Sequence, residues 1–510
     1  MVFSIIIIFV RSNVIMKMLK RYILFVVFAL SSIVAAAQGW SVQWNAETDF
    51  LGGTGDYLPF WARTGRDGIV PYSSSALVIG GADVEYEADN GLYFQAGTNL
   101  VGNLTSRNPL QETHVGGIVD RLYVSGGWRM LHLDVGMKPH LKDYNELSVT
   151  GGNFVYSGNA RNMPGINAWT DWIYFEKGHW FGFKGNFSHY QTLDNRYVKG
   201  TMLHNKELAF KVAMGRKVDF IFGLEHWAQW GGDSPRYGPQ PSSFNDFYKV
   251  ILSLQGGDDA TKSDQINALG NHLGRAYVEV DWRAEKFDMS FRYQMPFEDA
   301  GGVKKLQNVP DGVYGVDWSF NRRDAFVTDV TLEFINTTWQ AGDVHDRPAT
   351  EEEKAQQNPD NPFYGRVVVG GLDNYFANGE YCSGWTNHGR VIGLPLILPY
   401  FSEKDGIVTS MMSTRLRAAH IGIKGNMIED LPYIFKATYS SNWGNYHIKE
   451  DSFFYSRPWQ LSLALELEFG KEITNLPMTL AVGAYGDIGK LYQNSFGLTL
   501  RIRYNDSRRF

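Results

Sequence analysis

The sequence has a single cysteine, Cys382, among its 510 residues. One thiol cannot form an intramolecular disulfide, and it cannot supply a cysteine-rich zinc site. The chain also lacks a basic excess, because its 48 lysines and arginines are outnumbered by 54 aspartates and glutamates. We therefore expect no basic surface for nucleic acid and no nucleic-acid partner.

Long apolar runs are absent after residue 40, and so are helical stretches rich in Ala, Glu, Lys and Leu. Aromatic side chains, in contrast, make up 15% of the chain, and glycine occurs 54 times. This mixture is typical of β-strands joined by tight turns. If this part of the chain enters a membrane, it must therefore do so with strands.

The first 37 residues have the pattern of a signal peptide. A positively charged segment at 17–21 precedes a short apolar run at 22–34, and Ala35 and Ala37 form a small-residue cleavage site. Cleavage is expected before Gln38. The alternative is an uncleaved anchor, but the apolar run is shorter than the roughly 20 residues that span a bilayer as a helix.

The N-terminal region also bears on where translation starts and where the mature domain begins. Arg11 interrupts an earlier apolar run, which favours a start at Met16 or Met18 over Met1. Residues 38–510 are expected to form a single domain.

Several segments alternate between apolar and polar side chains, which is the periodicity of a β-strand. The strongest are 275–282, 289–297, 461–469 and 495–504. Weaker examples lie near 82–88, 92–100, 118–126, 131–137, 172–176, 181–189, 208–214, 219–227, 328–336, 418–426, 434–441 and 478–486. These are about sixteen candidates, and short polar turns between many of them predict antiparallel hairpins.

Alternation does not by itself show which face of a strand is wet. A soluble multi-domain β protein, the alternative, would bury the apolar faces. A closed wall of about 16–18 strands, however, has a lumen too wide for its own side chains to fill, so its interior must be polar and its exterior apolar. We therefore predict an all-β transmembrane antiparallel β-barrel in the cell outer membrane, surrounded by outer-membrane lipid. Leu465 would face lipid and Glu466 the lumen.

Two further features fit this architecture. Aromatic residues at strand ends are expected to form interfacial girdles: Trp282, Phe297, Phe469 and Tyr504. Three long irregular stretches are expected to be extracellular or lumen loops: 138–170, 229–273 and 343–417. Within the second, residues 245–254 could form a short helix packed in or over the barrel.

Two stretches combine aromatic and polar residues in a way that suits sugars, because pyranose C–H faces stack on rings while amides and charged groups bind hydroxyls. The first, 225–232, includes Trp227, Gln229 and Trp230. Its alternative role is an interfacial girdle followed by an ordinary loop. The second, 383–395, includes Trp385 and Arg390, and its alternative role is a loop that fills the lumen. Together these supply the candidate polysaccharide ligands Trp227, Gln229, Trp230, Trp385 and Arg390.

No catalytic, metal or cofactor site is expected. The histidines at 204, 226, 272, 345, 388 and 420 do not have the H-x-x-x-H or H-E-x-x-H spacing of a metal site. There is no G-x-S-x-G nucleophile motif, and a lone thiol such as Cys382 is more often inert than nucleophilic.

The stretches 225–232, 271–275 and 383–395, in this order, resemble the Wzi-type capsule assembly proteins, and the resemblance covers residues from about 40 to 504. It implies an outer-membrane barrel of about eighteen strands with a lectin-like, non-enzymatic role. Its expected partners are capsular or extracellular polysaccharide and the polysaccharide export machinery.

The sequence departs from that family in two places. The better-known members carry a periplasmic helical bundle at the N-terminus, and in 38–82 this bundle is absent or reduced. The terminal aromatic residue of the barrel is either Tyr504 or Phe510. Two other functions stay open, a porin or solute channel and, less favoured, an outer-membrane hydrolase, for which no nucleophile–base pair is evident.

Overall fold

The computed structural model describes residues 39–510 except for 109–112, 140–143, 176–177, 299–301, 304, 343–346, 358, 360–363, 368–372 and 447–448. The predicted signal peptide, 1–37, lies outside the described residues. In the part of the chain that the structure describes, every helix is too short or too polar to cross a membrane.

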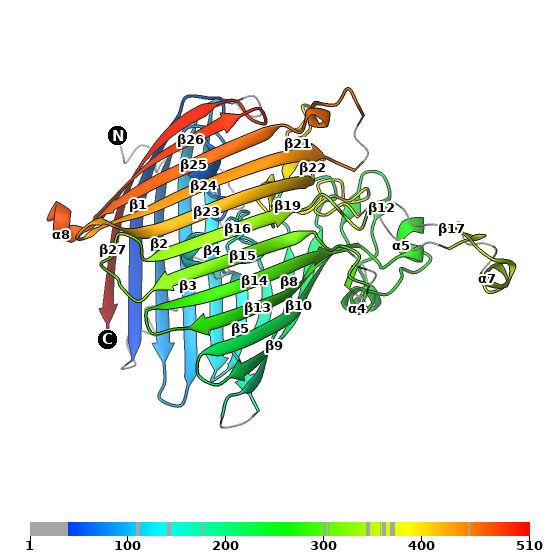
Figure 1. The fold of residues 1–510 in the computed structure, drawn as a ribbon, viewed down its shortest axis with the longest axis horizontal. Coiled ribbons are helices and arrows are strands. Elements are labelled where there is room, and N and C mark those ends of the chain that lie inside the picture. Colours follow the sequence, from blue (N-terminus) through cyan, green and yellow to red (C-terminus); the bar gives the residue numbers. More distant parts are fainter. Residues whose placement is uncertain are drawn as a thin grey trace, which may run out of the picture.

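The protein is a closed barrel of eighteen antiparallel strands (Figure 1). This confirms the predicted fold class. The strands of the wall are β1 (Trp40–Gly53), β2 (Ser75–Glu87), β3 (Leu92–Thr105), β4 (His114–Trp128), β5 (Leu131–Met137), β6 (Gly165–Thr170) with its short continuation β7 (Ile173–Tyr174), β8 (Phe181–Gln191), β9 (Met202–Met214), β10 (Val218–Trp230), β13 (Asn271–Arg283), β14 (Phe287–Phe297), β15 (Gly312–Phe320), β16 (Asp329–Asn336), β23 (Arg415–Ile428), β24 (Leu431–Gly444), β25 (Trp459–Phe469), β26 (Thr479–Gly489) and β27 (Ser495–Arg509).

Smaller elements lie in the loops. The helices are α3 (Phe60–Arg63), η1 (Tyr144–Glu146), α4 (Phe244–Leu252), α5 (Lys262–Ile266), α7 (Glu351–Ala355), η2 (Phe453–Ser456) and α8 (Lys471–Thr474). The short strand pairs are β11 (Asp233–Ser234) with β12 (Gly238–Pro239), β17 (Arg347–Pro348) with β18 (Arg366–Val367), β19 (Thr386–Asn387) with β20 (Arg390–Val391), and β21 (Leu398–Phe401) with β22 (Val408–Ser413).

The wall closes where the first strand meets the last. β1 pairs with β27 in one unbroken antiparallel register, from Ser41 opposite Arg509 to Gly53 opposite Gly497. The Phe510 amide donates to the Trp40 carbonyl at 2.8 Å, which extends the ladder by one residue. Closure matters because an open sheet edge would leave backbone groups without partners in hydrocarbon.

The strand prediction missed β1, β6 and β15, and the predicted loop 138–170 is wrong at its end, because residues 165–170 form β6 and pair with β5 and β8. In β1 the outer face includes Ala46 and Thr48, which weakens the apolar pattern. One girdle assignment is wrong. Phe297 is only 4% exposed, because it packs across Gly274 and beneath the loop that follows β14, whereas Trp282 is 41% exposed.

The faces of β25 agree with the predicted alternation. Leu465 is 37% exposed on the outer surface, while its neighbour Glu466 lines a cavity inside the barrel. β10 has the same arrangement, with Phe220, Phe222 and Leu224 exposed on the outside. These outward apolar side chains form the belt that contacts lipid.

The two ends of the barrel differ. Short turns such as 88–91 and 284–286 lie at the end that carries both termini of the wall, and the long loops lie at the other. Short turns are periplasmic in barrels of this kind, so the long loops are extracellular. Parts of loops 54–74, 138–164 and 337–414 fold into the lumen, where Phe60, Phe154 and Trp385 belong to one buried core with the wall. We call these three segments together the plug.

The closed ladder generates the first prediction. Protein extracted in detergent should be rich in β-structure and should change its gel mobility on boiling, because the closed wall of hydrogen bonds resists unfolding at room temperature. Circular dichroism and electrophoresis with and without boiling are the measurements. A monomer that stays in solution without detergent would contradict the barrel.

The two faces of β25 generate the second prediction. Leu465→Arg should impair assembly, because an arginine at mid-membrane costs on the order of 2–4 kcal/mol. Glu466→Gln, one residue away on the lumen side, should be tolerated. The amount of heat-modifiable barrel in outer-membrane fractions measures both variants, and equal yields would contradict the assigned faces.

Candidate functional site

Arg390 is presented by a small hairpin in the plug, formed by β19 and β20. Its guanidinium donates to the carbonyl oxygens of Val70 and Arg63, and it lies 4.0 Å from the centre of the Tyr72 ring. The Tyr72 hydroxyl donates to the Gly389 carbonyl at 2.9 Å. The first and third segments of the plug are therefore tied together around one cation.

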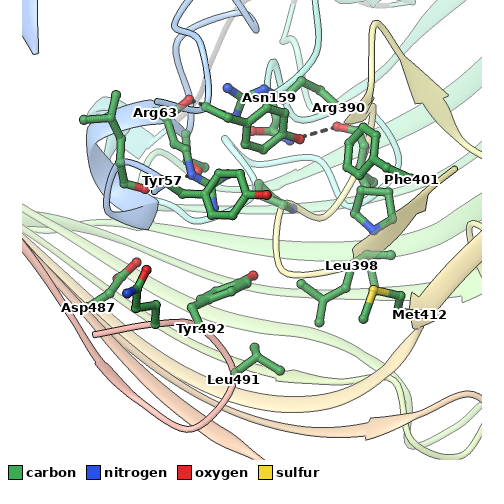
Figure 2. Close-up of a pocket in the computed structure, with 18 of the residues that line it drawn as sticks. Tyr57, Arg63, Asn159, Arg390, Leu398, Phe401, Met412, Asp487, Leu491 and Tyr492 are labelled. Carbon is green, nitrogen blue, oxygen red and sulfur yellow. Dashed lines mark hydrogen bonds between the residues drawn. The ribbon is translucent and has the colours of Figure 1, made fainter. Parts of the chain in front are cut away.

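Beside Arg390 lies a cavity of about 250 Å³ near the extracellular end of the barrel (Figure 2). Its wall combines flat aromatic rings with a few polar groups. The aromatic residues are Tyr57, Tyr72, Phe401, Phe453, Phe454 and Tyr492, and the charged or amide residues are Arg63, Asn159, Arg390, Asp487 and Gln493. We call this the aromatic cavity.

The cavity has a cationic wall. Arg63 and Arg390 both line it, and neither takes part in an ion pair within 4.0 Å among the described residues. Burial, together with the neighbouring Arg63 guanidinium, lowers the pKa of Arg390 to about 10. The Asp487 carboxylate already accepts the Phe60 amide at 2.8 Å. An acidic group entering the cavity would relieve the unpaired positive charge.

Gln229 and Trp385 were predicted as ligands, and the structure places them beneath the β19–β20 hairpin. The Gln229 side chain donates to the Gly384 carbonyl at 3.2 Å, and the Trp385 indole donates to the Val155 carbonyl at 2.8 Å. Both side chains are fully buried, so neither has surface for a ligand to contact in this conformation. They position the hairpin that carries Arg390.

Trp227 faces the lumen from β10. Its ring stacks on Tyr156 at 5.1 Å, and its indole donates to Glu225 at 2.6 Å. Glu225 also accepts from Arg275 at 2.6 Å and from Asn153 at 2.8 Å. Trp227 is 1% exposed, so it holds the second segment of the plug against the wall.

Trp230 lies on the opposite face of β10, outside the barrel. It is 3% exposed and stacks on Phe247 of α4 at 5.5 Å. Of the five predicted ligands, only Arg390 lines the aromatic cavity. The helix predicted at 245–254 is confirmed as α4, and it packs over the barrel wall.

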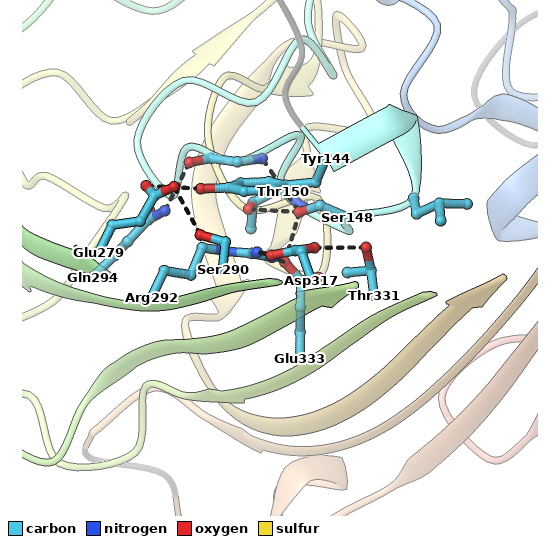
Figure 3. Close-up of polar contacts among 12 residues, drawn as sticks. Tyr144, Ser148, Thr150, Glu279, Ser290, Arg292, Gln294, Asp317, Thr331 and Glu333 are labelled. Atoms are coloured by element: carbon cyan, nitrogen blue, oxygen red, sulfur yellow. Dashed lines mark hydrogen bonds and ion pairs between the residues drawn. The ribbon is translucent and has the colours of Figure 1, made fainter. Parts of the chain in front are cut away.

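A second buried carboxylate holds the plug from the other side of the lumen (Figure 3). Glu333 of β16 accepts from Ser148 at 2.6 Å, from the Val149 amide at 2.8 Å and from Arg292 at 2.6 Å. Arg292 also pairs with Asp317. The three neighbouring wall strands β14, β15 and β16 and one loop of the plug therefore share a single charge network.

A second lumen cavity, of about 310 Å³, lies nearer the periplasmic end and has a different character. Its lining carries both signs of charge, including Glu47, Arg66, Arg501 and Arg503. These groups pair with one another, for example Glu47 with Arg66 at 3.0 Å and with Arg503 at 2.8 Å.

The described residues include no group of three or more His, Cys, Asp or Glu side chains arranged to hold a metal ion. His226 and His272 contact each other at 2.9 Å on the outer face of the wall. Burial raises the pKa of the Cys382 thiol, which disfavours the reactive thiolate.

Sequence reasoning missed most of the aromatic cavity. Tyr57 and Tyr72 come from the loop 54–74, Phe401 from the loop 337–414 and Tyr492 from the turn between β26 and β27, so no single stretch of sequence contains the cavity. A pair such as Tyr57 and Tyr492 becomes adjacent only because β1 and β27 are neighbours in the closed wall.

Comparisons with known proteins bear on the fold. The chain matches no protein-family model and no curated protein sequence. Among solved structures it is similar to Wzi of Escherichia coli, an outer-membrane protein involved in group 1 capsule assembly and described as a carbohydrate-binding β-barrel. The TM-score is 0.51 at 13% identity, over 93% of this chain and 85% of that chain.

Lower similarity is found to OccAB4 of Acinetobacter baumannii and to OccD3 of Pseudomonas aeruginosa. Both have a TM-score of 0.46 and cover 92% of this chain; identities are 9% and 8%, and 99% and 91% of those chains are covered. At its identity the likeness to Wzi shows the fold alone, and membership of the Wzi-type family stays a prediction. The protein is an outer-membrane β-barrel.

The lumen network generates the third prediction. Glu333→Gln should lower the free energy of unfolding by about 1–3 kcal/mol, because hydrogen bonds to a buried charge are lost while Arg292 stays buried. Hydrogen exchange at residues 144–150 should rise in parallel. The matched control is Glu429→Gln, in an exposed turn. Urea unfolding in detergent measures both, and equal effects would contradict an anchoring role.

Proposed function

We propose that this protein is a non-enzymatic polysaccharide-binding barrel that holds capsular or other extracellular polysaccharide at the cell surface. The observation that carries the proposal is the aromatic cavity. Rings such as Tyr57, Tyr72 and Phe401 line it together with amide and guanidinium groups, and this is the combination that sugars require.

The position and size of the cavity suit a polymer of which only a short part is bound at each barrel. The lining loops lie at the extracellular end, and the volume of about 250 Å³ suits one sugar unit or a chain end rather than a whole polymer. Because a polymer repeats, many copies of the barrel could hold it at several points, and weak individual sites would suffice.

The charge of the cavity narrows the substrate class. Arg63 and Arg390 have no carboxylate within 4.0 Å among the described ion pairs, so an acidic sugar would gain more here than a neutral one. The predicted ligands Trp227, Gln229 and Trp385 then act indirectly, by fixing the hairpin and loop that shape the cavity.

A solute channel is the second candidate. It is favoured by the charged lumen cavity around Glu47, Arg66 and Arg501, which would suit small ions or polar solutes. The buried core formed by the plug and the wall argues the other way, because Phe154 and Trp385 occupy lumen space that a channel would leave open. Conductance across a planar bilayer separates the two functions.

The fourth prediction tests the aromatic cavity. In a deletion strain complemented with Tyr57→Ala and Phe401→Ala together, polysaccharide should shift from the cells into the medium. Each ring contact contributes on the order of 1 kcal/mol, so the double variant should bind one site roughly tenfold more weakly or worse. The matched control is Tyr237→Ala, an exposed aromatic residue on another extracellular loop.

Folded barrel must be quantified in the same cells from its heat-modifiable band. Normal barrel with normal retention in the double variant would exclude the aromatic cavity. A steady ion conductance of the wild-type protein, with unchanged retention in the deletion strain, would favour the channel instead.

A further inference from the structure

The helix α4 forms for local reasons. Ser243 accepts from the Asp246 amide at 3.2 Å, and the Asp246 carboxylate accepts from the Ser243 amide at 2.9 Å, which together make a capping box. At the other end Ser253 adopts a left-handed conformation, with φ of 53°. The loop therefore contains a defined nine-residue helix.

One side of α4 is fixed to the outside of the barrel. Val250 is fully buried in a cluster with Ala228 and Trp230 of β10, and Phe247 packs against the same cluster. Lys206, on the outer face of β9, donates to the Ile251 carbonyl at the C-terminal end of the helix. Figure 1 shows α4 at the loop end of β9 and β10.

A second apolar side of α4 is exposed. Phe244, Tyr248 and Leu252 follow one another at intervals of four residues and are 85%, 55% and 49% exposed. At 3.6 residues per turn these side chains share one stripe, separate from the stripe that contains Phe247 and Val250.

The full circumference of α4 is therefore divided into three sectors. Apolar side chains cover roughly 200° of it, from Val250 through Phe247 to Leu252, which is wider than packing on the wall alone requires. The remaining polar sector holds Asn245, Asp246 and Lys249. Asn245 is exposed, and the buried Asp246 carboxylate is bound to Ser243 and Lys249. One apolar side of α4 therefore packs on the barrel wall, and a second apolar side is exposed. This arrangement suits a helix that lies where the barrel wall meets the membrane surface.

The exposed stripe continues the lipid-facing belt. Along β10, the outward-facing Phe220, Phe222 and Leu224 are 40%, 45% and 42% exposed, whereas Ala228 and Trp230, which pack against α4, are 0% and 3% exposed. The belt therefore ends on this strand where the cover of α4 and its loop begins. Beyond this point the exposed apolar surface is formed by Phe244, Tyr248 and Leu252 of α4 instead of by the wall.

We propose that α4 is an interfacial helix, which inserts Phe244, Tyr248 and Leu252 into the extracellular leaflet of the lipid around the barrel. Aromatic side chains are favoured at this depth, and an amphipathic helix lies in the plane of the interface with its polar side toward water. The proposal does not depend on the polysaccharide function, since the surface lies outside the lumen.

The test uses the full chain in vesicles of phosphatidylethanolamine and phosphatidylglycerol, prepared with and without a fraction of nitroxide-labelled phosphatidylcholine. In a Cys382→Ser background, an environment-sensitive fluorophore is attached at Phe244→Cys, at Asn245→Cys on the polar sector, and at Phe222→Cys on the belt as a positive control. The label at 244 should emit at shorter wavelength than the label at 245. Nitroxide-labelled phosphatidylcholine should quench the fluorescence of the label at 244, as it does for the label at 222. Aqueous iodide should quench the label at 244 only weakly.

Iodide quenching at 244 equal to that at 245 would overturn the proposal. A label at 244 that is shielded from iodide but not quenched by nitroxide lipid would also overturn it, and would place a second copy of the chain on α4. Each labelled protein must keep its heat-modifiable band. If the variant at 244 loses this band, Tyr248→Cys replaces it, because Tyr248 lies on the same stripe.

Discussion

The width of the lumen is the constraint on which the rest of the structure depends. Eighteen strands enclose more space than the inward side chains of the wall can fill, and in this protein loops enter that space. Their backbone amides and carbonyls then need partners away from water. Glu333 and Arg275 supply such partners from the wall: Glu333 accepts the Val149 amide and Arg275 donates to the Gly152 carbonyl. The buried charges are therefore the means by which a polar wall accepts an inserted loop.

The aromatic cavity follows from that arrangement. Hydrogen bonds attach the plug to the wall at several levels of the lumen, so the β19–β20 hairpin has a defined position. From this hairpin Arg390 donates to the Val70 carbonyl of the first loop. Aromatic residues from other loops complete the wall, with Tyr72 and Phe401 meeting edge to face at 5.9 Å. The aromatic cavity is thus formed by residues from several loops, and no single strand or sequence motif contains it.

The sequence predicts the barrel but not the candidate site, and the reason is physical. Alternation within a segment such as 461–469 is a local property, so it predicted strand faces correctly, and it failed at β1, where Ala46 and Thr48 dilute the apolar face. Burial of loop residues is set by distant contacts. For Trp385 the sequence left both a ligand and a lumen-filling loop open, and the indole's hydrogen bond to the Val155 carbonyl, 230 positions earlier in the chain, is a contact that no local pattern predicts.

The pairing of β1 with β27 also has a kinetic side. Neighbouring hairpins can form as soon as their own residues are available, but the closing ladder joins residues from the two ends of the wall, such as Ser41 and Arg509. Contacts of such long sequence separation form slowly, because the intervening chain must be ordered first. Until then both end strands are unpaired edges, able to pair with other chains. Assembly of this barrel therefore includes a late, exposed stage at which a chaperone or insertion partner would have to shield the two open strands.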